Sequence, residues 1–181
     1  QLAFGAASDA IAVARIFVNT NMAVCGGVLG AMALTQLIYK KVDLTLVLNG
    51  AIGGLVSISA APLDPAIWQA LMIGGIGGVI VTISVPAFDR LKIDDVVGVI
   101  PAHLLCGVWG TLIVAWTNES ATIFGQIAGV AIIGAFVFTT STLAWLMLRY
   151  SIGVRANAEQ ELHGLDRVEL GLDSYPEFGK G

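Results

Sequence analysis

Long apolar stretches separated by short charged segments make up most of this chain. Five runs of 20 or more residues contain no charged side chain: 16–39, 44–63, 65–88, 96–118 and 120–148. An α-helix of about 20 apolar residues is long enough to cross the hydrocarbon core of a bilayer. The pattern therefore predicts an all-α, polytopic membrane helix bundle with five transmembrane helices, the first of which begins near Ser8.

Composition leads to the same class of protein. The chain is 56% hydrophobic and only 12% charged, whereas a soluble domain carries about 25% charged residues. We therefore expect membrane lipid around the chain. The nine Lys and Arg residues are scattered and form no basic patch, so we expect no nucleic-acid partner. The chain begins with Gln1 and shows no signal-peptide pattern, so we expect further sequence upstream.

Basic residues alternate between the connections of the five runs. Pairs follow the first, third and fifth runs: Lys40 with Lys41, Arg90 with Lys92, and Arg149 with Arg155. The other two connections contain no Lys or Arg. Because basic residues concentrate in cytoplasmic loops, this pattern predicts a multi-pass protein of the cell membrane with a cytoplasmic C-terminus.

The composition changes from apolar to charged after Tyr150. Residues 151–181 carry nine charged side chains. A segment of about 30 residues is too small to fold alone, so it packs on the membrane domain or a partner, or stays disordered. We therefore divide the chain into a transmembrane domain, residues 1–150, and a C-terminal tail, residues 151–181.

The fourth run carries the candidate chemistry. His103 is the only histidine in the apolar runs, and an ionisable residue at membrane depth marks a substrate or proton pathway. A neutral imidazole both donates and accepts hydrogen bonds. On a regular helix Val99 and Cys106 share its face, so we predict a pathway lined by these three residues. Interhelical packing of His103 is the alternative. Asp94 or Asp95 is expected to cap the N-terminus of this helix.

Small and polar residues in the runs predict close helix packing. Four Gly-x-x-x-Gly pairs place two small residues on one helix face: Gly26/Gly30, Gly50/Gly54, Gly74/Gly78 and Gly125/Gly129. Asn49 is expected to form an interhelical hydrogen bond. No acid or second histidine in the runs completes a metal site with His103 and Cys106, so we expect no metal or cofactor. Protease and hydrolase motifs are absent, so we expect no enzyme.

Several motifs, taken in order, are specific to one family. They are Phe17-Val18-Asn19-Thr20-Asn21, Lys41-Val42-Asp43-Leu44-Thr45 with Leu48-Asn49-Gly50-Ala51, Ile93-Asp94-Asp95, and the glycine-flanked His103. The tail adds Gly153-Val154-Arg155, Glu161, Gly164-Leu165-Asp166, Gly171 and Tyr175-Pro176-Glu177-Phe178, with Glu169-Leu170-Gly171 departing from the usual Glu-His-Gly. Over nearly all 181 residues the sequence resembles the C-terminal half of an ammonium transporter of the Amt/Mep/Rh family.

The resemblance implies a specific architecture. These helices would be helices seven to eleven of an eleven-helix protomer built from two inverted repeats, with one pore in each subunit of a homotrimer. His103 matches the second of two pore histidines. The first histidine, the outer ammonium site and a paired phenylalanine gate would belong to the upstream half.

The resemblance also implies a mechanism and a regulatory tail. Ammonium loses a proton, ammonia crosses the channel-like apolar slot, and the proton passes through the histidine pair. The tail, including Arg155, Glu161, Gly164, Asp166 and Tyr175, would dock on cytoplasmic loops. Binding of a PII-type signal protein at that face is left open. Two other classes remain: an ammonium sensor that signals through its tail, and a helical interaction subunit without transport.

Overall fold

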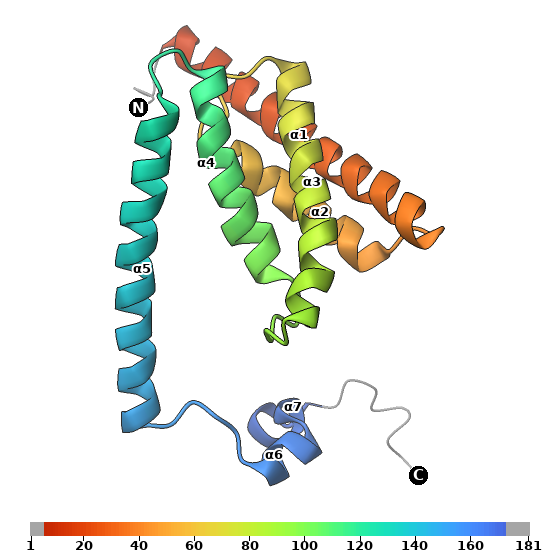
Figure 1. Cartoon of the computed structure of the whole chain (residues 1–181), viewed down its shortest axis with the longest axis vertical. Coiled ribbons are helices and arrows are strands. Elements are labelled where there is room, and N and C mark those ends of the chain that lie inside the picture. Colours follow the sequence, from red (N-terminus) through yellow and green to blue (C-terminus); the bar gives the residue numbers. More distant parts are fainter. Residues whose placement is uncertain (1–5, 173–181) are drawn as a thin grey trace. The chain divides into compact units, whose positions relative to one another are not determined.

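The computed structural model describes residues 6–172, which form helices connected by turns and contain no strand. In chain order the elements are α1 (Ala7–Tyr39), α2 (Leu44–Ile58), α3 (Ile67–Arg90), the π-helix η1 (Ile100–Leu105), α4 (Cys106–Thr117), α5 (Ile123–Ser151), α6 (Ala158–His163) and α7 (Leu165–Leu170). This confirms the predicted all-α class (Figure 1).

The chain divides into two compact units, Gln1–Ile132 and Ile133–Gly181. The first contains α1 to α4 and the beginning of α5, and the second contains the rest of α5 and the two short tail helices. Each unit is described by itself below.

Helices occupy all five predicted runs, but their lengths differ from the prediction in two places. Four spans are long and apolar enough to cross a membrane: Ala7–Tyr39, Ile67–Arg90, Ile100–Thr117 and Ile123–Ser151. The second helix has only 15 residues and ends at Ile58, because the turn that follows contains Pro62 and Pro65, whose rings fix φ and which lack amide donors. The fourth span has 18 residues rather than the expected 23, because residues 96–99 and 118 lie outside it.

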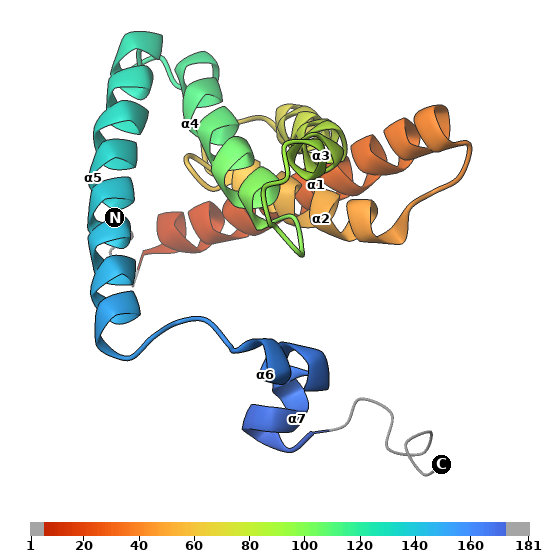
Figure 2. The same cartoon turned by 60° about the horizontal axis from the view of Figure 1, so that its bottom comes forward.

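Glycine allows α1, α2 and α3 to pack backbone against backbone. A Cβ atom at Gly26 would overlap the carbonyl oxygen of Leu71, one at Gly27 would overlap that of Gly50, and one at either Gly54 or Gly74 would overlap that of Ala23. Figures 1 and 2 show α1 crossing α3 at this contact. Three of the four predicted glycine pairs therefore lie in helix contacts, as their spacing indicates.

The fourth glycine pair, in α5, has different surroundings. No heavy atom lies within 4 Å of a Cβ built at Gly129, and Gly125 meets only the hydroxyl of Thr122 in its own first turn. None of the 29 residues of α5 is buried in the structure. The glycine spacing of α5 thus has no packing counterpart in the described part of the chain.

The connection between α2 and α3 is fixed by polar side chains from two other helices. Asn19, which is fully buried in α1, donates from Nδ2 to the carbonyl oxygens of Pro62 (2.9 Å) and Pro65 (2.8 Å). Asn118, at the end of α4, donates to the carboxylate of Asp64 at 2.7 Å. The Asn19 bonds satisfy backbone carbonyls that the irregular segment leaves free. Together with the Asn118 bond they tie α1, α2, α3 and α4 together at one end of the bundle.

Candidate functional site

The site begins at the turn that leads into the His103 helix. The two carboxylate oxygens of Asp95 accept hydrogen bonds from the amides of Val99 and Ile100, both at 2.8 Å. The amide of Gly98 donates to the backbone carbonyl of Asp95 at 3.2 Å. Asp95 therefore satisfies the first amides of the helix, whereas the carboxylate of Asp94 makes no hydrogen bond with another described residue.

The six residues Ile100–Leu105 form a π-helix, with His103 inside it. At its end the amide of Cys106 donates to the carbonyl of Pro101, five residues back, and to that of His103. Short π-helical segments within α-helices occur frequently at functional sites. The apolar pattern of the sequence does not predict this segment. Pro101, which removes an amide donor from the first turn, was the signal that could have revealed it.

The π-helix places His103 and Cys106 on different sides of the segment, whereas a regular helix would place them on the same face. The His103 side chain is exposed, as are those of Val99 (49%) and Leu104 (59%). Cys106 is fully buried, and its thiol lies 3.5 Å from the carbonyl oxygen of Gly77 in α3. This corrects the expectation that Cys106 shares the face of His103, because the wider π turn displaces the residue three positions along the chain.

The buried side of this helix is held against α2 and α3 (Figure 1). The indole Nε1 of Trp109 donates to the carbonyl of Ile73 at 3.1 Å. Gly110 lies so close to the backbone of Ser57 that a Cβ atom there would overlap the Ser57 carbonyl oxygen. The helix is thus fixed on one side and leaves Val99 and His103 free on the other.

The exposed face combines one imidazole with apolar neighbours. Among the described residues, no three His, Cys, Asp or Glu side chains come together as metal ligands. An imidazole in such surroundings can accept a proton at one nitrogen and release one from the other. The arrangement is therefore suited to proton transfer along an apolar path.

The sequence profile described as the Ammonium Transporter Family matches residues 3–175. The chain belongs to the ammonium transporter family. This match covers the whole membrane region of the chain and most of its tail.

Curated relatives of this ammonium-transporter chain come from archaea, bacteria and the nematode Caenorhabditis elegans. It is 34% identical over 186 residues to the ammonium transporter Amt2 of Archaeoglobus fulgidus, covering 92% of this chain and 40% of that protein. It is 36% identical over 178 residues to Amt2 of Haloferax mediterranei, covering 92% and 39%. The chain thus spans about two-fifths of the length of these relatives.

A solved structure titled "Sensor Amt Protein" has the same fold as this family member. It superimposes with a TM-score of 0.81 at 27% identity, over 88% of this chain and 42% of the other. The fold therefore corresponds to less than half of that transporter-family protein.

Asn49 of this ammonium-transporter chain makes a contact between α2 and the start of the His103 helix. Its Nδ2 donates to the carbonyl oxygen of Val97 at 2.8 Å. The side chain expected to form an interhelical bond therefore binds the turn that precedes η1.

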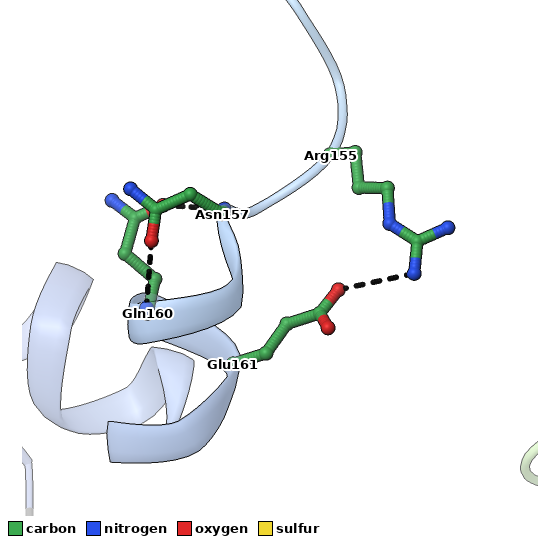
Figure 3. A network of polar contacts seen from close by, with 4 residues as sticks. All are labelled: Arg155, Asn157, Gln160 and Glu161. Atoms are coloured by element: carbon green, nitrogen blue, oxygen red, sulfur yellow. Dashed lines mark hydrogen bonds and ion pairs between the residues drawn. The ribbon is translucent and has the colours of Figure 1, made fainter.

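In the tail of this family member the structure brings together two of the residues that the sequence singled out. Arg155 and Glu161 form an ion pair at 3.4 Å, with side chains 86% and 49% exposed. Asn157 and Gln160 form the capping box of α6, as Figure 3 shows.

Gly164, with φ +86°, separates α6 from α7, and Asp166 lies in the first turn of α7. Tyr175 lies outside the described residues. The ion pair between Arg155 and Glu161 is exposed and contributes little to stability. It and the capping box fix only the local conformation around α6.

Proposed function

We propose that this chain forms the C-terminal part, helices seven to eleven, of a homotrimeric ammonium transporter in the cell membrane. Ammonium loses a proton at the outer side, and neutral ammonia passes an apolar slot beside Val99 and His103. His103 then serves in a proton relay with a second histidine from the upstream part. The complete protein transports ammonium, and this part of it catalyses no enzymatic reaction.

The exposure of His103 on an otherwise apolar helix face is the observation that carries this proposal. The opposite side of the same helix is fixed by Cys106, Trp109 and Gly110, so the imidazole is held at a defined position. Moving an intact cation through an apolar slot requires its desolvation, which is expensive, whereas ammonia is neutral. The names of the relatives, ammonium transporters, agree with this substrate.

Flux measurements in proteoliposomes test the proposal. They require a full-length transporter that carries this chain as its C-terminal part. We expect His103→Ala to lower selective ammonium flux about a hundredfold, the scale of a lost proton-transfer group. His103→Glu should retain part of the flux because a carboxylic acid can also carry a proton.

The matched control is His163→Ala, which removes the other histidine of the chain, in the tail helix α6. Its flux should equal that of the wild type. Wild-type flux and selectivity in the His103→Ala protein, with the trimer intact, would reduce His103 to a packing residue.

Topology is part of the same proposal, since the alternating basic residues favour a cytoplasmic tail. Single cysteines at Asp64 and Glu119 should react with an impermeant thiol reagent in intact cells. A cysteine at Lys41 should react only after permeabilisation. Reaction at Lys41 in intact cells would reverse the orientation.

The tail is proposed to regulate transport by docking on cytoplasmic loops such as residues 90–94. Deletion of residues 153–181 from the full-length protein should change the flux and expose the 90–95 loop to protease. The control is Glu159→Gln, which changes an exposed residue of α6 outside the residues assigned to docking and should leave the flux unchanged. If deletion leaves flux and proteolysis unchanged, the tail has no regulatory role.

An ammonium sensor is the second candidate function, favoured by the likeness to the solved structure titled "Sensor Amt Protein". A sensor binds ammonium and changes its tail with little flux. Ammonium-dependent proteolysis of residues 151–172, in a protein that shows no flux in proteoliposomes, would establish this function instead of transport.

A further inference from the structure

An open groove runs along the first half of α1 and the beginning of α3. It has a volume of about 840 Å³. Apolar side chains from both helices line most of it: Ile11, Val18, Met22, Ile67, Trp68 and Leu71. Arg15 is the one charged residue among the described residues that line it. The groove therefore combines an apolar surface with a single cation.

The glycine contact between α1 and α3 closes one end of the groove. A Cβ atom at Gly26 would overlap the carbonyl oxygen of Leu71, so the two backbones touch there. The helices cross at this contact and separate away from it (Figures 1 and 2). The lining positions of α1 run only from Ile11 to Met22, about 17 Å along the helix axis. This length is roughly half of the 30 Å hydrocarbon core, which is the depth of one leaflet.

Arg15 lies where lipid headgroups are expected. Helix α1 has 33 residues and a length of about 50 Å, so it extends well beyond the hydrocarbon core, and its charge-free run starts immediately after Arg15. Trp68 forms an edge-to-face pair with Trp116, with ring centroids 6.4 Å apart. Tryptophans concentrate at the interface between lipid and water. Arg15 and the tryptophan pair thus mark the headgroup level at the open end of the groove.

Arg15 forms no ion pair with a carboxylate of the described residues. Its Nη2 lies 3.4 Å from the backbone carbonyl oxygens of Asp64 and Pro65, which are neutral acceptors. The carboxylate of Asp64 instead accepts the side-chain amide of Asn118. A guanidinium has five N–H donors in a planar fork that matches two oxygens of a phosphate. The charge of Arg15 and most of its donors are therefore left for a ligand.

We propose that this groove binds one phospholipid of the surrounding bilayer, with its phosphate on Arg15 and one acyl chain against Val18, Met22 and Leu71. The phosphate supplies the anion, and the acyl chain matches a groove that is one leaflet deep. A membrane-spanning helix, from the upstream part or from a second copy, would fit the groove over only half its length, because the glycine contact closes it beyond Met22. The site shares no residue with the face that carries His103, so the inference does not depend on transport.

Photo-cross-linking of the full-length protein that carries this chain tests the site. The probe is phosphatidylglycerol with a diazirine on one acyl chain, added to detergent-solubilised protein, and mass spectrometry locates the modified residues. We expect adducts at Val18, Met22 or Leu71. Unlabelled phosphatidylglycerol should displace the probe. Diacylglycerol, which has no phosphate, and inorganic phosphate, which has no acyl chain, should not displace it.

Removal of the cation should weaken this binding. Arg15→Gln should lower the yield of groove adducts about fivefold, the contribution of one arginine near a membrane surface to the binding of anionic lipid. Arg15→Lys keeps the charge and should retain part of the yield. The matched control is Lys40→Gln, which removes an exposed cation at the opposite end of α1 and should leave the groove adducts unchanged.

A second variant covers the case in which Arg15→Gln does not assemble. Val18→Trp places an indole in the groove and should abolish the adducts at Met22 and Leu71. Adduct yields that neither Arg15→Gln nor Val18→Trp changes would overturn the inference, as would equal competition by diacylglycerol or by inorganic phosphate. A groove without adducts is covered by the upstream part or by a second copy, which also overturns it. Ammonium flux is no part of this readout, so failure of the proposed function leaves the test intact.

Discussion

The glycines of α1–α3 and those of α5 have the same spacing but opposite surroundings. At Gly26, Gly54 and Gly74 the neighbouring backbone lies so close that no side chain would fit. At Gly129 nothing lies within 4 Å of the Cβ position, and at Gly125 only the Thr122 hydroxyl does. The comparison teaches that Gly-x-x-x-Gly spacing indicates a face suited to close packing, and that the partner of that face need not belong to the same stretch of chain.

Substitution of a packed glycine should lower the stability of the protein more than any other change considered. Gly27→Leu forces a side chain into the carbonyl of Gly50, and we expect a loss of about 3 kcal/mol in the free energy of unfolding. Thermal unfolding of the solubilised full-length protein measures it. Gly129→Leu is the control, and an equal loss there would remove the distinction between the two regions.

Loss of a tryptophan hydrogen bond should have an intermediate effect on stability, and this effect should differ between the packed helices and α5. Trp109→Phe removes the bond from Nε1 to Ile73 and should lower the stability by about 1 kcal/mol. Trp145→Phe in α5, where the side chain is 62% exposed, should change it much less. The same unfolding experiment compares them, and a larger loss at Trp145 would mean that α5 is covered in the full-length protein.

The smallest effect is expected at an unpacked glycine. Gly129→Ala should raise the stability by about 0.5 kcal/mol, because alanine favours the helix and nothing obstructs its methyl group. Size-exclusion chromatography and thermal unfolding provide the measurement. A fall in stability together with loss of the oligomer would show that another subunit or the upstream part packs on this face.

Much of the fold could be predicted from hydrophobic pattern alone. Apolar length alone predicts α1, α3 and α5 within a few residues, because a span without charges has few alternatives to a helix. The length of α2 was overestimated because the apolar run continues through Pro62 and Pro65, which cannot continue the helix.

The candidate site was predicted less completely. The cap was predicted as Asp94 or Asp95, and the structure assigns it to Asp95. The pathway role of His103, which an isolated histidine in an apolar run indicates, stays a prediction. The error at Cys106 arose from assuming a regular helical period through Pro101. The bond from Asn49 to Val97 joins residues 48 positions apart. Such a pair depends on how α2 packs against the turn, and the periodicity of the sequence holds no information on that packing.

The glycine contacts also determine where this protein can move. Backbone surfaces in direct contact have no rotamers to exchange, so α1, α2 and α3 cannot slide or repack by small side-chain adjustments. Any displacement within these helices must then arise in a segment held by individual hydrogen bonds. Residues 95–105 are such a segment, because they are held by the hydrogen bonds of Asp95 and Asn49 and contain the wider turn of the π-helix. We expect the hinge of the described membrane helices to lie there.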